Sequence, residues 1–199
     1  MRKSWVVLVV TLMSAGSPAW AQTGSHFGKQ GSVSLGAERL FGLSHASDGG
    51  ASITTISLIG SSGNELSVAP YGVPRIGFDY FVLDGLSLGL GAEFANISPE
   101  NASSVTILGL NPRVGYAVRA SDVLSLWPRA GISYVHLSTG DPAPADSRYL
   151  LAATIELQVV VTPVRHFGFL IGPTVDIGVA ATGSKLTQYG LQAGLIGWF

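Results

Sequence analysis

The sequence predicts an all-β fold: a closed, antiparallel, up-and-down β-barrel of eight strands that crosses a membrane. The first observation is that apolar residues alternate with small or polar ones along eight segments, and a period of two indicates β-strands. The second is that the last segment, Tyr189 to Phe199, suits one tilted membrane crossing of about 9–11 residues. The third is that charged residues make up only 12% of the chain, against about 25% in ordinary soluble domains.

Each predicted strand has an apolar row on one face and a small or polar row on the other. The strands are expected at 31–43, 71–83, 85–96, 104–119, 122–137, 149–162, 166–180 and 187–199. Their apolar rows run from Val33 to Leu43, Ile76 to Val82, Leu86 to Phe94, Leu108 to Val118, Leu124 to Tyr134, Leu151 to Val161, Phe167 to Val179 and Tyr189 to Phe199. The last row has an aromatic residue at each end, as expected at the two water–lipid interfaces.

The connections alternate between short and long. Short turns are expected at 84–85, 120–121 and 163–165, and longer loops at 97–103, 138–148 and 181–186. Short periplasmic turns and long outer loops are typical of outer-membrane barrels, so both ends of the barrel domain should lie on the periplasmic side. Residues 44–70 are interpreted as an outer loop whose β-prone piece, Ile53 to Ile59, extends the sheet above the membrane. The alternative is that this piece is a ninth spanning strand.

A short motif, Pro-Arg-x-Gly, recurs at 74–77, 112–115 and 128–131. Proline within a strand lacks a ladder donor and usually marks an edge or a bulge. A closed barrel has no edge, so the motif predicts local bulges.

The N-terminus reads as a cleaved secretory signal peptide over residues 1–21. Arg2 and Lys3 form a charged region, Trp5 to Met13 an apolar core, and Ala19 to Ala21 a small-x-small cleavage site. The alternative is an uncleaved anchor, but the apolar run is short for a membrane span. Residues 22–199 would then form a single barrel domain, and since the chain has no cysteine, it needs no disulfide.

The non-lipid row carries eight charged residues that we interpret as a network inside the barrel. They are Glu38, Arg75, Asp79, Glu93, Arg113, Arg129, Glu156 and Asp176. Buried charges must pair, and eight strands leave an interior that side chains just fill, so a plug is favoured over an ion or proton path. If residues 119 and 122 pair at the turn, Arg113 lies opposite Pro128, with Glu93 and Glu156 placed to separate Arg113 from Arg129.

An inverted arrangement, a lipocalin-like cup with the apolar face inward, is the alternative topology. It would expose rows of Gly, Ser and Gln to water, with only Lys29 and Lys185 as lysines in the mature chain. Such a surface is poor in charge for a soluble protein.

No cofactor or metal is expected, because the four histidines show no metal-ligand spacing. The net charge of −1 gives no basic footprint for nucleic acid. His136 and Ser138 lie two apart at the outer end of a strand, so both point the same way.

The last residue, Phe199, resembles the terminal assembly signal of outer-membrane barrels. Residues 31–199 resemble the OmpA/OmpX-type superfamily of small eight-stranded barrels. The resemblance implies a monomer in the bacterial outer membrane, surrounded by lipid and inserted by the barrel assembly machinery, with Phe199 as its signal. We expect a non-enzymatic protein with a structural or interaction role, in which the extracellular loops meet a surface ligand that the sequence does not identify. The alternative is a small porin-like channel.

The enzymatic alternative also rests on a resemblance. A histidine two residues before a serine is similar to the catalytic pair of outer-membrane lipid A deacylases, which would make Ser138 the nucleophile and His136 its base. Thr139 and Gly140 follow here, where that family has Asn-Ala-Gly. A lipid A-modifying esterase is therefore the least favoured of the three functions.

Overall fold

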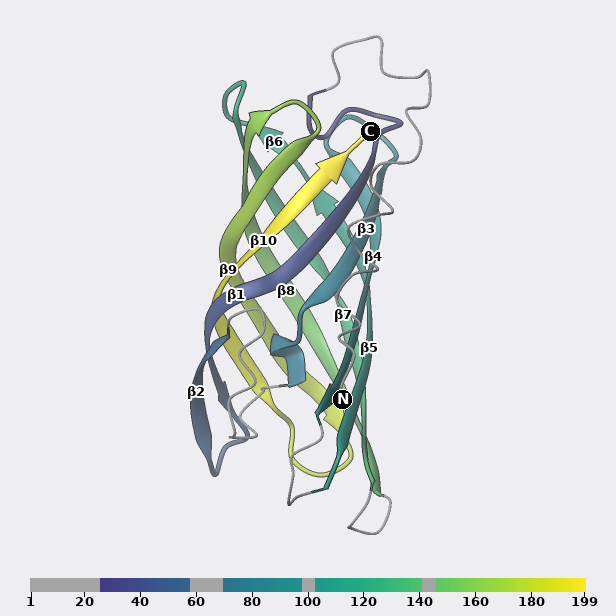
Figure 1. Cartoon of the computed structure of the whole chain (residues 1–199), viewed down its shortest axis with the longest axis vertical. Helices are drawn as coiled ribbons and strands as arrows, with labels where there is room; N and C mark the ends of the chain where they lie inside the picture. Colours follow the sequence, from purple (N-terminus) through teal and green to yellow (C-terminus); the bar gives the residue numbers. More distant parts are fainter. Residues whose placement is uncertain (1–25, 58–69, 98–102, 141–145) are drawn as a thin grey trace, which may run out of the picture.

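The computed structural model describes residues 26–57, 70–97, 103–140 and 146–199, which form one closed antiparallel barrel (Figure 1). The signal peptide predicted at residues 1–21 lies outside the described residues, as do 98–102 and 141–145 of the predicted outer loops. In the part of the chain that is described, no helix is long and apolar enough to cross a membrane.

Eight strands form the ring, as predicted. They are β1 (Val33–Ser47), β3 (Arg75–Phe81), β4 (Leu86–Ile97), β5 (Val105–Tyr116), β7 (Leu124–Thr139), β8 (Asp146–Val164), β9 (Phe167–Ala181) and β10 (Thr187–Trp198). Each pairs with the next, and β10 closes the ring on β1 from Ser34↔Trp198 to Ser47↔Thr187. The short β6 (Val118–Arg119) continues β5 and pairs with β7.

β2 (Ser52–Ser57) lengthens the wall and is not a ninth crossing. It pairs antiparallel with the outer end of β1, from Gly42↔Ser57 to Ser47↔Ser52. β1 therefore runs on to Ser47, so the predicted loop 44–70 begins as a β-hairpin. In its turn, the backbone N–H groups of Ala51 and Gly50 donate to the Asp48 carboxylate and lower its pKa. Residues 58–69 lie outside the described part of the chain.

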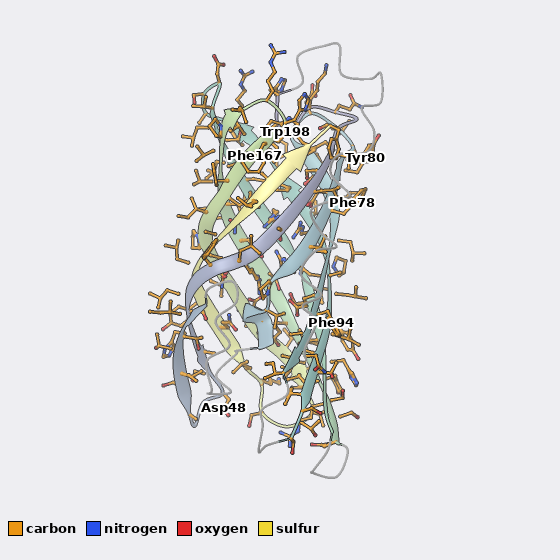
Figure 2. All side chains as sticks on the ribbon, viewed as in Figure 1. Asp48, Phe78, Tyr80, Phe94, Phe167 and Trp198 are labelled. Carbon is orange, nitrogen blue, oxygen red and sulfur yellow. The ribbon has the colours of Figure 1, made fainter. Side chains whose placement is uncertain are left out.

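The two faces of the wall are as the alternation predicts: apolar outside, and polar or charged inside. Large apolar side chains cover the outside, among them Phe78, Tyr80 and Phe94 (Figure 2). The charged residues of the predicted network have buried or nearly buried side chains on the inward row. The lipocalin-like alternative is therefore wrong.

The bulges expected at the prolines of β5 and β7 are absent. Pro112 pairs with Leu90 and Pro128 with Leu157 inside ladders of unbroken register. The ladder between β5 and β7 is interrupted at Asn111 and Pro112 and resumes at Arg113 in the same register. The ladder therefore accommodates the missing donor by losing local pairing, with no inserted residue.

Both ends of the lumen are filled by segments outside the ring of strands. At the end predicted to be periplasmic, Phe27 packs edge-on against Phe81, Trp127 and Trp198, with ring centroids 5.1–5.6 Å apart. At the opposite end, predicted to face outward, η3 (Pro70–Gly72), a 3₁₀ turn, lies within the barrel (Figure 1). The strand predicted at 71–83 therefore starts only at Arg75, because two prolines and a glycine at 70–74 favour a turn.

Candidate functional site: the charged lumen

The centre of the lumen is organised around Glu38 of β1. Arg75 Nε lies 2.6 Å from Glu38 Oε2. Arg113 makes a two-pronged contact, with Nη1 at 2.7 Å from Oε2 and Nη2 at 2.8 Å from Oε1. Arg129 Nη1 lies 2.6 Å from Oε1. One carboxylate thus binds the three arginines of the Pro-Arg-x-Gly motifs, which arrive from β3, β5 and β7.

Glu156 of β8 is a second hub. Its Oε2 lies 2.7 Å from Arg129 Nη2, and its Oε1 accepts a short hydrogen bond from Arg75 Nη2. Arg129 and Glu156 are direct cross-strand partners on β7 and β8, so strand order correctly placed this acid beside this arginine. Arg75 and Arg129 each bridge the two hubs, and all these side chains are buried.

Arg39 is the member of the network that the sequence pattern missed. Its Nη2 lies 3.1 Å from Glu156 Oε1 and 3.2 Å from Asp176 Oδ2. Residues 38–40 of β1 lie opposite the single residue Gly194, between the pairs Ala37↔Leu195 and Phe41↔Ala193. This bulge, in which Arg39 has a left-handed φ of 56°, turns both Glu38 and Arg39 inward.

A signal for Arg39 was present in the sequence. In a regular strand Arg39 would lie in the apolar row between Ala37 and Phe41, facing lipid. Such an arginine costs about 2–4 kcal/mol near the bilayer midplane. The alternation of side chains does not reveal this bulge. Its two extra residues are an even number, so from Phe41 onward the inward and outward positions are the same as in a regular strand.

Two further carboxylates complete the network. Asp79 Oδ2 lies 2.5 Å from Arg113 Nη2. Asp176 accepts a hydrogen bond of 2.7 Å from the Thr154 hydroxyl, which in turn is 2.6 Å from the Ser133 hydroxyl. With Arg39 included, four arginines face four ion-paired carboxylates: Arg39, Arg75, Arg113 and Arg129 against Glu38, Asp79, Glu156 and Asp176.

Glu93 lies on the inward row, as predicted, but it does not separate Arg113 from Arg129. It is the cross-strand partner of Arg75 and of Gly109, and it forms no ion pair within 4.0 Å among the described residues. The expected register between β5 and β7 was also wrong, since Arg113 pairs with Gly131, not Pro128. The turn closes between Ala120 and Leu124, so the hairpin is longer than assumed. As a result Glu38, not Glu93, separates Arg113 from Arg129.

The network leaves almost no free space. A Cβ atom added to Gly77, on the inward row of β3, would lie 2.5 Å from Arg113 Nη2 and 2.6 Å from Glu38 Oε1. The cavity beside Arg39, Arg129 and Gln192 holds about 10 Å³, roughly the room for one water molecule. The arrangement can bind water and hold the strands together.

The candidate catalytic pair lies elsewhere, on the outer half of β7. His136 pairs with Leu108 and Tyr149, and Ser138 with Thr106 and Ser147, so both lie on the outward row. Glu156 is committed to the buried arginines and does not orient His136. Over the described ranges, no group of three or more His, Cys, Asp or Glu residues could hold a metal ion.

Phe199 lies at the seam that closes the barrel. Its backbone N–H donates to the Val33 carbonyl at 2.9 Å, and the Val33 N–H donates to the Phe199 carbonyl at 3.1 Å. The phenyl ring is largely exposed. The terminal residue therefore contributes the last rung between the first and last strands.

No protein-family model matches the sequence, and no curated protein sequence matches it. Solved structures do match. Neisserial surface protein A superposes with a TM-score of 0.62 at 11% identity, covering 84% of this chain and 99% of that chain. Ail, the attachment invasion locus protein of Yersinia pestis, in complex with the heparin analogue sucrose octasulfate, superposes with a TM-score of 0.53 at 10% identity, covering 84% of this chain and 99% of that chain. Together with the closed ring of eight strands, these matches show that the chain has the fold of the small eight-stranded outer-membrane β-barrel proteins.

Proposed function

We propose that this chain is a non-enzymatic protein of the bacterial outer membrane, with a structural or interaction role carried by its outer loops and a lumen that does not conduct ions. The observation that carries the proposal is the sealed interior. The charged network fills the middle, and Phe27 and η3 close the two ends. A barrel without a passage can act only through its wall and its ends.

The outer wall supports a position in lipid. Large apolar side chains are exposed on strands all round the ring, for example Phe41, Ile76, Leu108, Ile132, Ile155 and Ile171. Aromatic side chains lie near both ends of this band; Tyr80 and Phe167 are near the periplasmic end (Figure 2). An apolar surface of this extent is stable only when lipid covers it.

The outer end supports a role in interaction but does not favour a polyanionic ligand. Ail, which has the same fold, was crystallised with a heparin analogue. In this chain the described outer residues Arg148 and Lys185 are balanced by Asp48 and Asp146, so they give no basic patch. The ligand of the outer loops is therefore proposed to belong to another chemical class.

Assembly follows from the same proposal. The chain would be exported by its signal peptide and inserted into the outer membrane by the barrel assembly machinery, which would read Phe199. It would then remain a monomer in lipid, because the ring is already closed by β1 and β10.

Two experiments test the proposal. Membrane fractionation combined with heat-dependent gel mobility should place the protein in the outer membrane as a heat-modifiable band. In planar bilayers, the purified protein should show no steady conductance. A stable conductance whose ion preference changes in Arg129→Glu would refute the sealed lumen and support the small pore.

Exchange of the outer loops tests the interaction role. The exchanged variant should lose surface binding while keeping its heat-modifiable mobility. Surface binding that survives exchange of all the outer loops would contradict this role.

A further inference from the structure

The outer half of the lumen is an apolar chamber that the chain fills with its own residues. Ile107, Val135, Leu150 and Ala152 line it, and Tyr71 and Val73 are buried among them. The η3 turn contacts both β1 and β7, which are not neighbours in the ring, so it reaches across the lumen (Figure 1). This chamber, defined by its four lining residues, lies on the outer side of the charged network.

A single arginine connects the occupant to the network. Arg39 Nη1 donates a hydrogen bond to the backbone carbonyl of Tyr71, while Nη2 contacts Glu156 and Asp176. The chamber thus has apolar walls and, at its floor, one arginine whose Nη1 faces the occupant while its Nη2 is paired with two carboxylates. Small-molecule sites in proteins commonly combine these two features.

Tyr71 fills the chamber imperfectly. Its side chain is buried, yet its hydroxyl has no hydrogen-bond partner among the described residues. Burying a hydroxyl without a partner is unfavourable, so the same ring without the hydroxyl would bind more strongly. The unpartnered hydroxyl therefore weakens the packing of Tyr71 in the chamber.

The chamber adjoins a cavity at the outer mouth of the barrel. This cavity has a volume of about 370 Å³. Ile107 belongs to both, and Val105 and Leu137 line the cavity while packing against the residues of the chamber. Thr139, Asp146 and Arg148 supply its polar lining. A molecule in the outer mouth would meet the chamber without crossing the barrel wall.

We propose that the chamber is a binding site for a small molecule with an aromatic ring and a carboxylate, and that Tyr71 is its built-in competitor. The ring would take the place of the Tyr71 ring among the aliphatic side chains. The carboxylate would take the place of the Tyr71 carbonyl at Arg39 Nη1, as a stronger, charge-assisted acceptor. Only the fraction of molecules in which Tyr71 has left the chamber can bind the ligand, so the apparent affinity for the ligand is reduced by that fraction.

Binding at this site leaves the floor of the chamber in place. Arg39 Nη2 remains on Glu156 and Asp176, and the hubs below it are untouched. The lumen should therefore stay non-conducting whether Tyr71 is in the chamber or displaced from it. The site serves capture of a ligand from the outer side, not its passage.

The test is a fluorine NMR titration of the protein in phosphatidylcholine nanodiscs with para-fluorophenylacetate, corrected with empty nanodiscs. Tyr71→Ala empties the chamber and should tighten binding roughly tenfold or more. Tyr71→Phe removes the unpartnered hydroxyl, strengthens the internal competitor and should weaken binding below that of the parent. Tyr80→Ala, which removes a lipid-facing tyrosine, should leave the affinity unchanged.

Two further comparisons locate the probe. Adding Ala152→Phe to Tyr71→Ala refills the chamber and should abolish the gain in affinity. Para-fluorobenzylamine, which has the same ring but an ammonium group, should not bind beside Arg39. The proposal is overturned if Tyr71→Ala binds no more tightly than the parent or if Tyr71→Phe binds more tightly. If Tyr71→Ala does not fold, the comparison of Tyr71→Phe with the parent decides alone.

Discussion

Removing Glu156 should destabilise the barrel strongly, because its carboxylate is buried at the centre of the charged network. Its side chain is 2% exposed and forms ion pairs with Arg39 at 3.1 Å, with Arg129 at 2.7 Å, and with Arg75. Glu156→Ala leaves four arginines facing three carboxylates in the network. Breaking a buried pair costs roughly 3–5 kcal/mol. We expect a loss of about 3 kcal/mol, at the lower end of that range, because each arginine keeps one other carboxylate.

The matched control is Asp146→Ala. Asp146 pairs with Arg148 at 2.9 Å, but their side chains are 54% and 66% exposed. Exposed pairs of this kind contribute about 0–1 kcal/mol. The assay is urea unfolding of each variant refolded into lipid vesicles, followed by tryptophan fluorescence and gel mobility. If the two variants lose the same free energy of unfolding, the network does not stabilise the fold and our reasoning is wrong.

A double variant separates charge imbalance from loss of packing. Arg39→Met removes one cation and keeps most of the side-chain length. Combined with Glu156→Ala it restores equal numbers of arginines and carboxylates in the network. The double variant should be more stable than Glu156→Ala alone, because an uncompensated buried charge is what makes the single change costly. A double variant whose loss equals the sum of the two single losses would instead indicate a packing effect.

Three further predictions test the wall, the interior and the seam. Leu90→Arg places a charge on the lipid face and should lower the free energy of unfolding in lipid by about 2–4 kcal/mol. Leu90→Met is the control and should change it little. Equal stability of the two variants would contradict the assigned faces. Gly77→Ala puts a methyl group where the Arg113 and Glu38 side chains meet, so it should lower the urea midpoint of unfolding. Gly197→Ala is the control, because its methyl group would lie 3.4 Å from one backbone oxygen and should not lower the midpoint. A Gly77→Ala midpoint like that of the parent would show that the interior is loosely packed. Deleting Phe199 should reduce folded protein in the outer membrane without reducing export to the periplasm, and normal assembly of the deletion would remove its role as a signal.

The alternation of side chains was enough to predict the ring, because in a barrel each residue must face either lipid or lumen. The row from Leu86 to Phe94 shows this on β4, where the apolar residues lie outside and Glu93 faces inward. The same alternation could not reveal the apolar ends of the lumen. Trp127 and Leu170 face inward near the end predicted to be periplasmic, where the outward neighbours are apolar as well, so the contrast between the two faces disappears.

The sequence by itself determined the class of fold, the number of spanning strands and the inward position of all eight predicted network residues, because these depend only on parity along each strand. Only the tertiary structure decided which charges meet. The register across the 120–123 turn moved Arg113 away from Pro128, and a two-residue bulge in β1 brought Arg39 inward without disturbing the alternation. Parity is a local property, whereas register and bulges depend on how turns close and how neighbouring strands pair. The pairing of charges within the network therefore follows from contacts between strands that are distant in sequence.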